Sequence, residues 1–147
     1  LKNKIFFSAA ATVSFKFLEQ SPASILITDN NGIIEYVNLT FSRTTGWDFQ
    51  ETVGKNPSFI KSGDTPPETY TSLWNTILSG KNWRGEIQNR RKNGDVYWDS
   101  VSISPLFSET GEIINFVSVQ EDITERKKLE EALMRETVKA VESERLK

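Results

Sequence analysis

The chain has 147 residues, a length that suits one domain with short extensions. Its 18 basic and 20 acidic residues give a net charge of -2, which argues against a dedicated nucleic-acid binder. Because cysteine and histidine are both absent, disulfides, thiolate metal sites, histidine-based hydrolysis, histidine-ligated haem and a phospho-accepting histidine are excluded within this chain, and a non-enzymatic module is favoured.

The first segment, residues 4–19, is predicted to form an amphipathic helix. Its apolar residues recur at spacings of one, three and four: Ile5, Phe6, Ala9, Val13 and Phe17. Lys16 interrupts the apolar run, leaving it short of the roughly 20 residues that span a bilayer, so a packed helix is favoured over the end of a membrane segment. Since the chain does not begin with methionine, we expect a piece of a longer, cytoplasmic protein whose anchorage to a membrane is left open.

A hairpin is predicted over residues 24–38. The runs SILITD and GIIEYVN are rich in β-branched residues, and the turn Asp-Asn-Asn-Gly joins them. Asn38 is expected to cap a short helix that Gly46 ends, and a second short helix is expected near residues 50–53.

A longer helix is predicted between Thr65 and Gly80. Thr65 is expected as its N-cap, with Pro66 in the first turn and Glu68 completing a capping box. One face should lie against the sheet, and it comprises Tyr70, Leu73, Trp74, Ile77 and Leu78.

Three strands are expected next, at residues 83–91, 96–106 and 113–121. With the first hairpin they make five antiparallel strands, and the predicted fold class is α+β with short helices on one face of the sheet and a flanking helix at each end. The expected division is a helix at 1–20, a domain at 21–122 and a linker helix at 123–147.

The last helix is expected to start with a capping box of Asp122 and Glu125. Its narrow apolar stripe comprises Leu129, Ala132, Leu133, Ala140 and Val141. Because Glu136 and Ser143 fall where a heptad needs apolar residues, we expect a helix that does not form a stable coiled coil in isolation.

The register of the hairpin at 83–103 follows from burial. A three-residue loop, residues 92–94, pairs Asn89 with Tyr97 and Ile87 with Asp99 and collects the apolar residues on one face, which a two-residue loop does not. Asn89 and Asp99 then lie on the apolar face, where they bond each other or backbone groups of the helices, or point into a cavity and hold a ligand. Trp98 faces outward and should be covered by the N-terminal helix or by another subunit.

Four stretches carry further motifs: SPASILITDNNGIIEYVNLTFSRTTGW, ETVGKNPS, TPPETYTSLWNTILSGKNWRGEIQNRRKNGDVYW and DITERKKLEEAL. Over roughly residues 19–133 they resemble the PAS sensory domain of bacterial signalling proteins. The resemblance implies the PAS fold and a sensory role.

Within that family the motifs are most similar to the FAD-holding PAS domains of NifL-type redox sensors. That likeness implies that Trp74 and Asn89 lie at a cofactor, with the inward-facing Trp83 nearby. Two positions depart from those sensors: Pro57 replaces a glutamate, and Leu26 aligns with a serine on the first strand.

Light-oxygen-voltage domains are also similar. They have an asparagine at the position of Asp99, and their strand-five glutamine matches Gln120, but their photoreactive cysteine is absent here. An ionised Asp99 would repel a flavin carbonyl unless burial keeps the carboxyl protonated. The cofactor therefore stays unassigned: FAD or FMN is the specific candidate, an empty or small-metabolite pocket is favoured, and haem is disfavoured for want of a histidine.

These observations predict a sensory input module, without enzymatic activity of its own, in a parent sensor histidine kinase. The state of the pocket would pass through the C-terminal helix to a covalently linked output domain. Two alternatives are a ligand-free dimerisation or spacer module and the input domain of a diguanylate cyclase. A homodimer is expected through the N-terminal helix, the Trp98 face of the sheet and the C-terminal helix.

Overall fold

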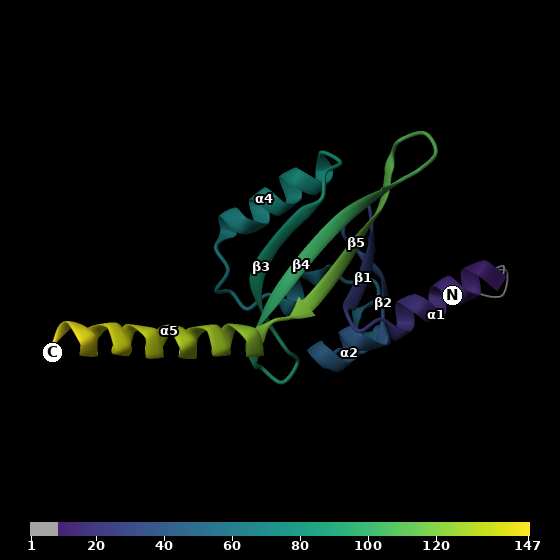
Figure 1. Ribbon diagram of the computed structural model, residues 1–147. Helices are drawn as coiled ribbons and strands as arrows, with labels where there is room; N and C mark the ends of the chain where they lie inside the picture. The colour runs from purple at the N-terminus through teal and green to yellow at the C-terminus, as the bar shows by residue number, and fades with distance from the viewer. Residues whose placement is uncertain (1–8) are drawn as a thin grey trace.

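The computed structural model describes residues 9–147, in which one five-stranded antiparallel sheet carries the helices (Figure 1). The strands are β1 (Ser24–Asp29), β2 (Ile34–Val37), β3 (Trp83–Arg90), β4 (Val96–Phe107) and β5 (Ile113–Asp122). They lie in the order β2-β1-β5-β4-β3, so the first strand of the hairpin pairs with the last strand of the chain. The predicted α+β class and all five strands are confirmed.

The connection between β2 and β3 contains four short helices. These are α2 (Leu39–Thr45), α3 (Phe49–Thr52), the 3-10 helix η2 (Pro57–Ile60) and α4 (Pro67–Leu78). Asn38 caps α2 through its side chain, and Gly46 ends it in the left-handed conformation, as predicted.

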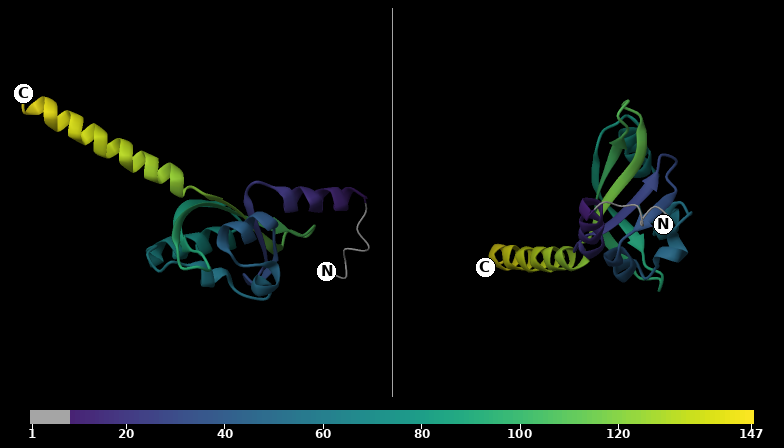
Figure 2. Two further views of the ribbon diagram at one scale, coloured as in Figure 1. Left: turned by 90° about the horizontal axis from the view of Figure 1, so that it is seen from below. Right: turned by 90° about the vertical axis from the view of Figure 1, so that its right-hand side faces the viewer.

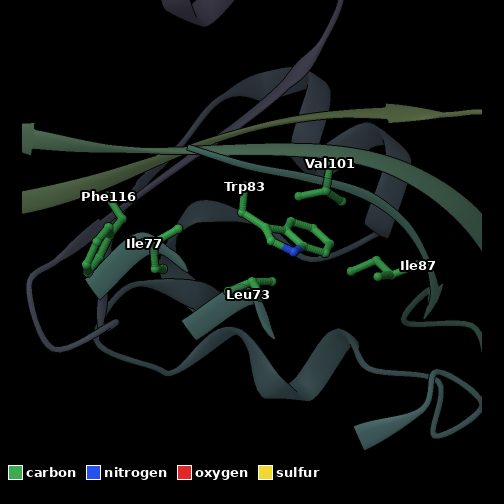
Figure 3. Packing of buried hydrophobic residues seen from close by; sticks show 6 residues of the cluster. All are labelled: Leu73, Ile77, Trp83, Ile87, Val101 and Phe116. Carbon is green, nitrogen blue, oxygen red and sulfur yellow. The ribbon is translucent and has the colours of Figure 1, made fainter. Parts of the chain in front are cut away.

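Two apolar clusters join these helices to the sheet. In the first, Leu73 and Ile77 of α4 point toward Trp83, Val101 and the neighbouring sheet residues (Figure 3). The second cluster lies under α2 and η2 and comprises Leu26, Ile34, Val37, Phe41 and Ile60.

The β3–β4 hairpin has the predicted register. Asn89 pairs with Tyr97 and Ile87 with Asp99, and Gly94 takes a φ of 96° in the loop. Asn89, Tyr97 and Asp99 are each 1% exposed, so the polar residues predicted on the apolar face are indeed buried there.

Helix α4 corrects two predictions. It begins after Pro66 without a side-chain cap, because the Thr65 hydroxyl instead accepts a hydrogen bond from the Gln88 amide of β3. Leu78 is 57% exposed and does not join the buried face. The segment before α4 is thus bound to the sheet edge rather than to its own helix.

The terminal helices are α1 (Ala9–Gln20) and α5 (Thr124–Arg145), which extend from opposite sides of the body (Figures 1 and 2). The predicted residues Ile5 and Phe6 lie outside the described part. Phe17 is 78% exposed, against the prediction; α1 instead docks through the ring of Phe15, whose centroid lies 5.7 Å from that of Tyr36.

Helix α5 begins differently from the prediction and projects away from the sheet, so that only its first turns lie near Trp98 (Figures 1 and 2). The Asp122 carboxylate accepts hydrogen bonds from Thr124, and no capping box with Glu125 forms. The Lys127 ammonium lies 4.3 Å from the centre of the Trp98 ring, so within the described chain the first turns of α5, rather than α1, cover Trp98.

No helix among residues 9–147 is both long enough and apolar enough to cross a membrane. The expected cytoplasmic location and the expected division into domains stay predictions.

Candidate functional site

A cavity of about 280 Å³ lies between the inner face of the sheet and the helices that cover it. Its volume is close to the lower end of the range for small-molecule sites, roughly 300 Å³. Most of its wall is apolar and comes from Leu26, Leu73, Trp74, Ile77, Val101 and Phe116. The indole of Trp74 meets the ring of Phe116 edge to face, at 6.2 Å between centroids.

Two buried amides from different strands share this cavity. Asn89 of β3 is 1% exposed, and its Nδ2 donates to Asp99 Oδ2 at 2.8 Å. Gln120 of β5 is 7% exposed, and its Nε2 donates to Ser118 Oγ at 3.1 Å. Neither amide oxygen accepts a hydrogen bond from the described part of the chain. Each can therefore accept one from a molecule in the cavity.

Asp99 lies behind Asn89 rather than in the cavity wall. Burial raises the pKa of Asp99 to about 7, against the hydrogen bond from Asn89, which favours the ionised form. Burial also raises the pKa of the adjacent Tyr97, and the Asp99 carboxylate adds to that increase. The carboxyl can therefore change its charge within the physiological pH range.

The structure brings four of the six predicted site residues together at the cavity: Leu26, Trp74, Asn89 and Gln120. Asp99 does not line the cavity and is joined to it only by its hydrogen bond with Asn89. Trp83 belongs to the core under α4, and its ring lies over Gly85, where an added Cβ would come within 2.5 Å of the indole. What each residue binds stays a prediction.

Sequence reasoning missed the helix side of the cavity, where Lys61 and Tyr70 take part in the wall. The Tyr70 hydroxyl is buried and has no hydrogen-bond partner in residues 9–147, and the Lys61 ammonium lies 3.9 Å from the centre of its ring. The backbone of Lys61 forms a bridge with that of Asn89. Only the spacing of Tyr70 on α4 signalled its inward direction.

Gly32 of the first hairpin turn also belongs to the wall. Its φ is 84°, and an added Cβ would lie 2.8 Å from Cη2 of Trp74. A glycine here lets the turn approach the tryptophan closely. The turn itself was predictable, but its contact with a residue 42 positions away was not.

A polar network joins the cavity end of the sheet to α5. Arg91 donates through Nη2 to Asp122 at 2.6 Å and through Nη1 to the Thr44 carbonyl at 2.6 Å, and its guanidinium lies 4.1 Å from the centre of the Tyr97 ring. Asp122 also accepts from both the amide and the hydroxyl of Thr124, the first residue of α5. The start of α5 is therefore held by the β3–β4 hairpin.

Comparisons with known proteins agree on one family. The model of the PAS domain matches residues 22–125. The nitrogen fixation regulatory protein of Klebsiella oxytoca is 34% identical over 119 residues, which are 81% of this chain and 24% of that protein. The blue-light-activated histidine kinase of Brucella anthropi is 32% identical over 122 residues, 80% of this chain and 25% of that protein.

Among solved structures, an RNA-binding light-oxygen-voltage receptor has a TM-score of 0.80 at 22% identity, covering 90% of this chain and 39% of that one. This likeness concerns the fold. The chain spans about a quarter of the length of the two curated relatives.

Proposed function

Because the chain belongs to the PAS domain family and is a signal-sensing input module, we propose that its cavity holds a flavin and that the flavin's state sets the docking of α5. The observation that carries this proposal is the pair of buried amides, Asn89 and Gln120, that share an otherwise largely apolar cavity. A bound flavin would supply visible absorption and a reversible change of redox state.

The residues present suit such a ring system. Asn89 and Gln120 each offer an amide oxygen that can accept from a ring N–H, and either amide can turn to donate to a ring carbonyl. Leu26, Trp74 and Phe116 offer flat or branched apolar surface. The blue-light-activated relative needs a chromophore, since ordinary side chains do not absorb visible light, and it is similar over most of this chain.

The test is reconstitution of the purified chain with riboflavin, FMN and FAD, followed by visible absorption and mass spectrometry of the released ligand. We expect flavin bands that stay with the protein through gel filtration. Asn89→Ala should weaken binding, whereas Asn93→Ala, in the exposed loop of the same hairpin, should not. A chain that retains no flavin, with intact fold by circular dichroism, would refute the flavin and leave a metabolite or an empty cavity.

The relay would use β5. Gln120 lies two residues before Asp122, and strand residues two apart share a face, so a displacement of Gln120 acts on the residue that holds α5. Gln120→Leu replaces the amide by an apolar side chain of similar size. In the full-length protein this variant should lose its response to the ligand or redox state; an unchanged response would contradict the relay.

For the parent protein we propose a sensor histidine kinase, as the Brucella anthropi relative is named, with a diguanylate cyclase as the alternative output. The output domain would be covalently attached through α5.

A homodimer is the second part of the proposal. It is supported by α5, whose apolar side chains have no cover among the described residues and include Leu129 (70% exposed), Leu133 (69%) and Val141 (62%). With α1 and the Trp98 face they would form a two-fold interface. Leu133→Glu should shift the molecular mass measured by light scattering toward the monomer, whereas Glu131→Lys should not. A wild-type monomer at high concentration would contradict this interface.

A further inference from the structure

Asn89 lines the cavity, Asp99 lies behind it, and the two form a buried hydrogen-bonded pair. Their contact joins Asn89 Nδ2 to Asp99 Oδ2 at 2.8 Å, and both residues are 1% exposed. An ionised carboxylate only accepts hydrogen bonds, so the amide must present its nitrogen to it. The other end of the Asn89 amide, the oxygen Oδ1, is then left for the cavity.

We infer that Asp99 determines the hydrogen-bonding specificity of the cavity: while ionised it fixes the Asn89 amide, so that the site selects a ligand with an N–H group at that point. Asp99 is in this sense a positioning residue, because it acts through Asn89 and does not itself line the cavity. The inference rests on the proposed function in taking the cavity as a ligand site, and it names the ligand class as a heteroaromatic lactam or imide.

Protonation of Asp99 removes this constraint. The carboxylic acid gains one O–H, which can donate to Asn89 Oδ1, and the amide can then turn its Nδ2 toward the cavity. The proton comes from solvent, so above the pKa of Asp99 the binding of a ligand that offers only an acceptor at this point is accompanied by uptake of one proton at the Asp99 carboxylate. Such a ligand should therefore bind more tightly as the pH falls.

The groups around Asp99 place this change near neutrality. Burial raises the pKa of Asp99 to about 7; besides Asn89 of β3, the neighbours are Tyr97 of β4, Asp122 of β5 and Arg91 of the hairpin loop. Tyr97 and Arg91 favour the ionised carboxylate, whereas Asp122 opposes it. Arg91 is itself paired with Asp122, so the two opposing charges largely compensate each other.

The first experiment compares two probes, riboflavin and its N3-methyl derivative, which lacks the imide N–H. Flavin fluorescence gives the dissociation constants for wild type, Asp99→Asn and the control Asp95→Asn, an exposed aspartate of the same hairpin. At about pH 8.5 wild type and control should prefer riboflavin by at least about tenfold, since an unmatched buried acceptor is costly. In wild type this preference should fall to roughly threefold or less at about pH 5.5, because Asp99 is then protonated. In Asp99→Asn it should be that small at both pH values, because an amide at position 99 can donate or accept.

A preference that persists unchanged in Asp99→Asn, or that does not depend on pH in wild type, would overturn the inference. The N-methyl group also adds steric bulk, but that contribution is the same in the variant and at both pH values, so only the change in preference is assigned to Asp99.

The second experiment needs no ligand and therefore separates this inference from the proposed function. In the ligand-free chain, the 13C shift of the Asp99 carboxyl and the 15N shift of the Asn89 side-chain amide are followed by NMR as the pH changes. Both should move with one midpoint, near pH 7. An Asn89 amide shift that does not change as Asp99 titrates would overturn the inference even if flavin binds. If neither probe binds, the flavin proposal fails, and this titration still tests whether Asp99 fixes the Asn89 amide.

Discussion

Replacing Asp99 by asparagine should stabilise the protein, and by an amount that depends on pH. The folded chain releases the Asp99 proton at a pKa of about 7, because burial disfavours the carboxylate, whereas the ordinary value is 3.8. Between these two pH values the folded state holds the proton and the unfolded state does not. The contribution of Asp99 to the free energy of unfolding therefore falls as the pH rises from about 4 to about 7, and the loss is complete above that.

One pKa unit corresponds to about 1.4 kcal/mol, so a carboxyl with a pKa of about 7 in place of 3.8 makes folding about 4 kcal/mol less favourable at alkaline pH. Asparagine has nearly the same shape, can still bond to Asn89 and cannot ionise. Asp99→Asn should therefore match wild type near pH 4 and exceed it by up to about 4 kcal/mol at pH 8.5.

Urea unfolding followed by tryptophan fluorescence, at half-unit pH steps, measures this difference. Asp122→Asn is the matched control, because there the sign is reversed. Although burial acts against it, hydrogen bonds from Thr124 and Arg91 lower the pKa of Asp122. That variant should be less stable than wild type at neutral pH and lose the difference as the pH falls. A difference for Asp99→Asn that is independent of pH, or destabilising at pH 8.5, would refute the reasoning.

Three further predictions concern the wall and the ends of the domain. Gly32→Ala should lower the free energy of unfolding in urea by about 1–3 kcal/mol more than Gly111→Ala does, since both glycines have positive φ but only Gly32 also meets Trp74. Equal losses in the two variants would contradict the close contact. Tyr36→Phe removes the hydroxyl that donates to Glu19, so hydrogen exchange should accelerate in α1 and stay unchanged in the sheet. Arg91→Gln removes the ion pair with Asp122, and exchange should accelerate in the first turn of α5; protection equal to wild type would show that the pair does not hold the helix.

The register of the β3–β4 hairpin was predictable because a strand shifted by one residue would move its whole apolar set to the wrong face. The burial of Asn89 and Asp99 followed from that register alone. Their direct hydrogen bond was one of the alternatives left open, beside bonds to the backbone of the helices and to a ligand, because no local pattern separates a polar pair that is satisfied internally from one that binds a ligand.

The wrong predictions share one physical cause. Thr65 and Asp122 carry side chains that can cap a helix, but tertiary partners changed how they do so: Thr65 bonds Gln88 of β3, and Asp122 bonds Arg91 as well as Thr124 at the start of α5. Phe17 and Leu78 fit a helical period, but the neighbouring elements decide which side of the helix is buried: α1 docks through Phe15, which leaves Phe17 on nearly the opposite side, and Leu78 lies outside the face of α4 that meets the sheet. Local preference predicts which groups can bond, and tertiary contacts choose among them.

The position of the Arg91–Asp122 pair explains why two strands, rather than one, could report the state of the cavity. Asn89 lies two residues before Arg91, which directly follows the end of β3, and Gln120 lies two residues before Asp122 on β5, so each cavity amide is close along the chain to one end of the ion pair. Under the proposed relay, a ligand that displaced either amide along its strand would change the same 2.6 Å contact at the start of α5. Because Asp122 also holds Thr124, the strength of this contact and the position of the first helical turn are linked. Opposite displacements of β3 and β5 would therefore act on α5 more strongly than a common shift, which leaves the pair intact.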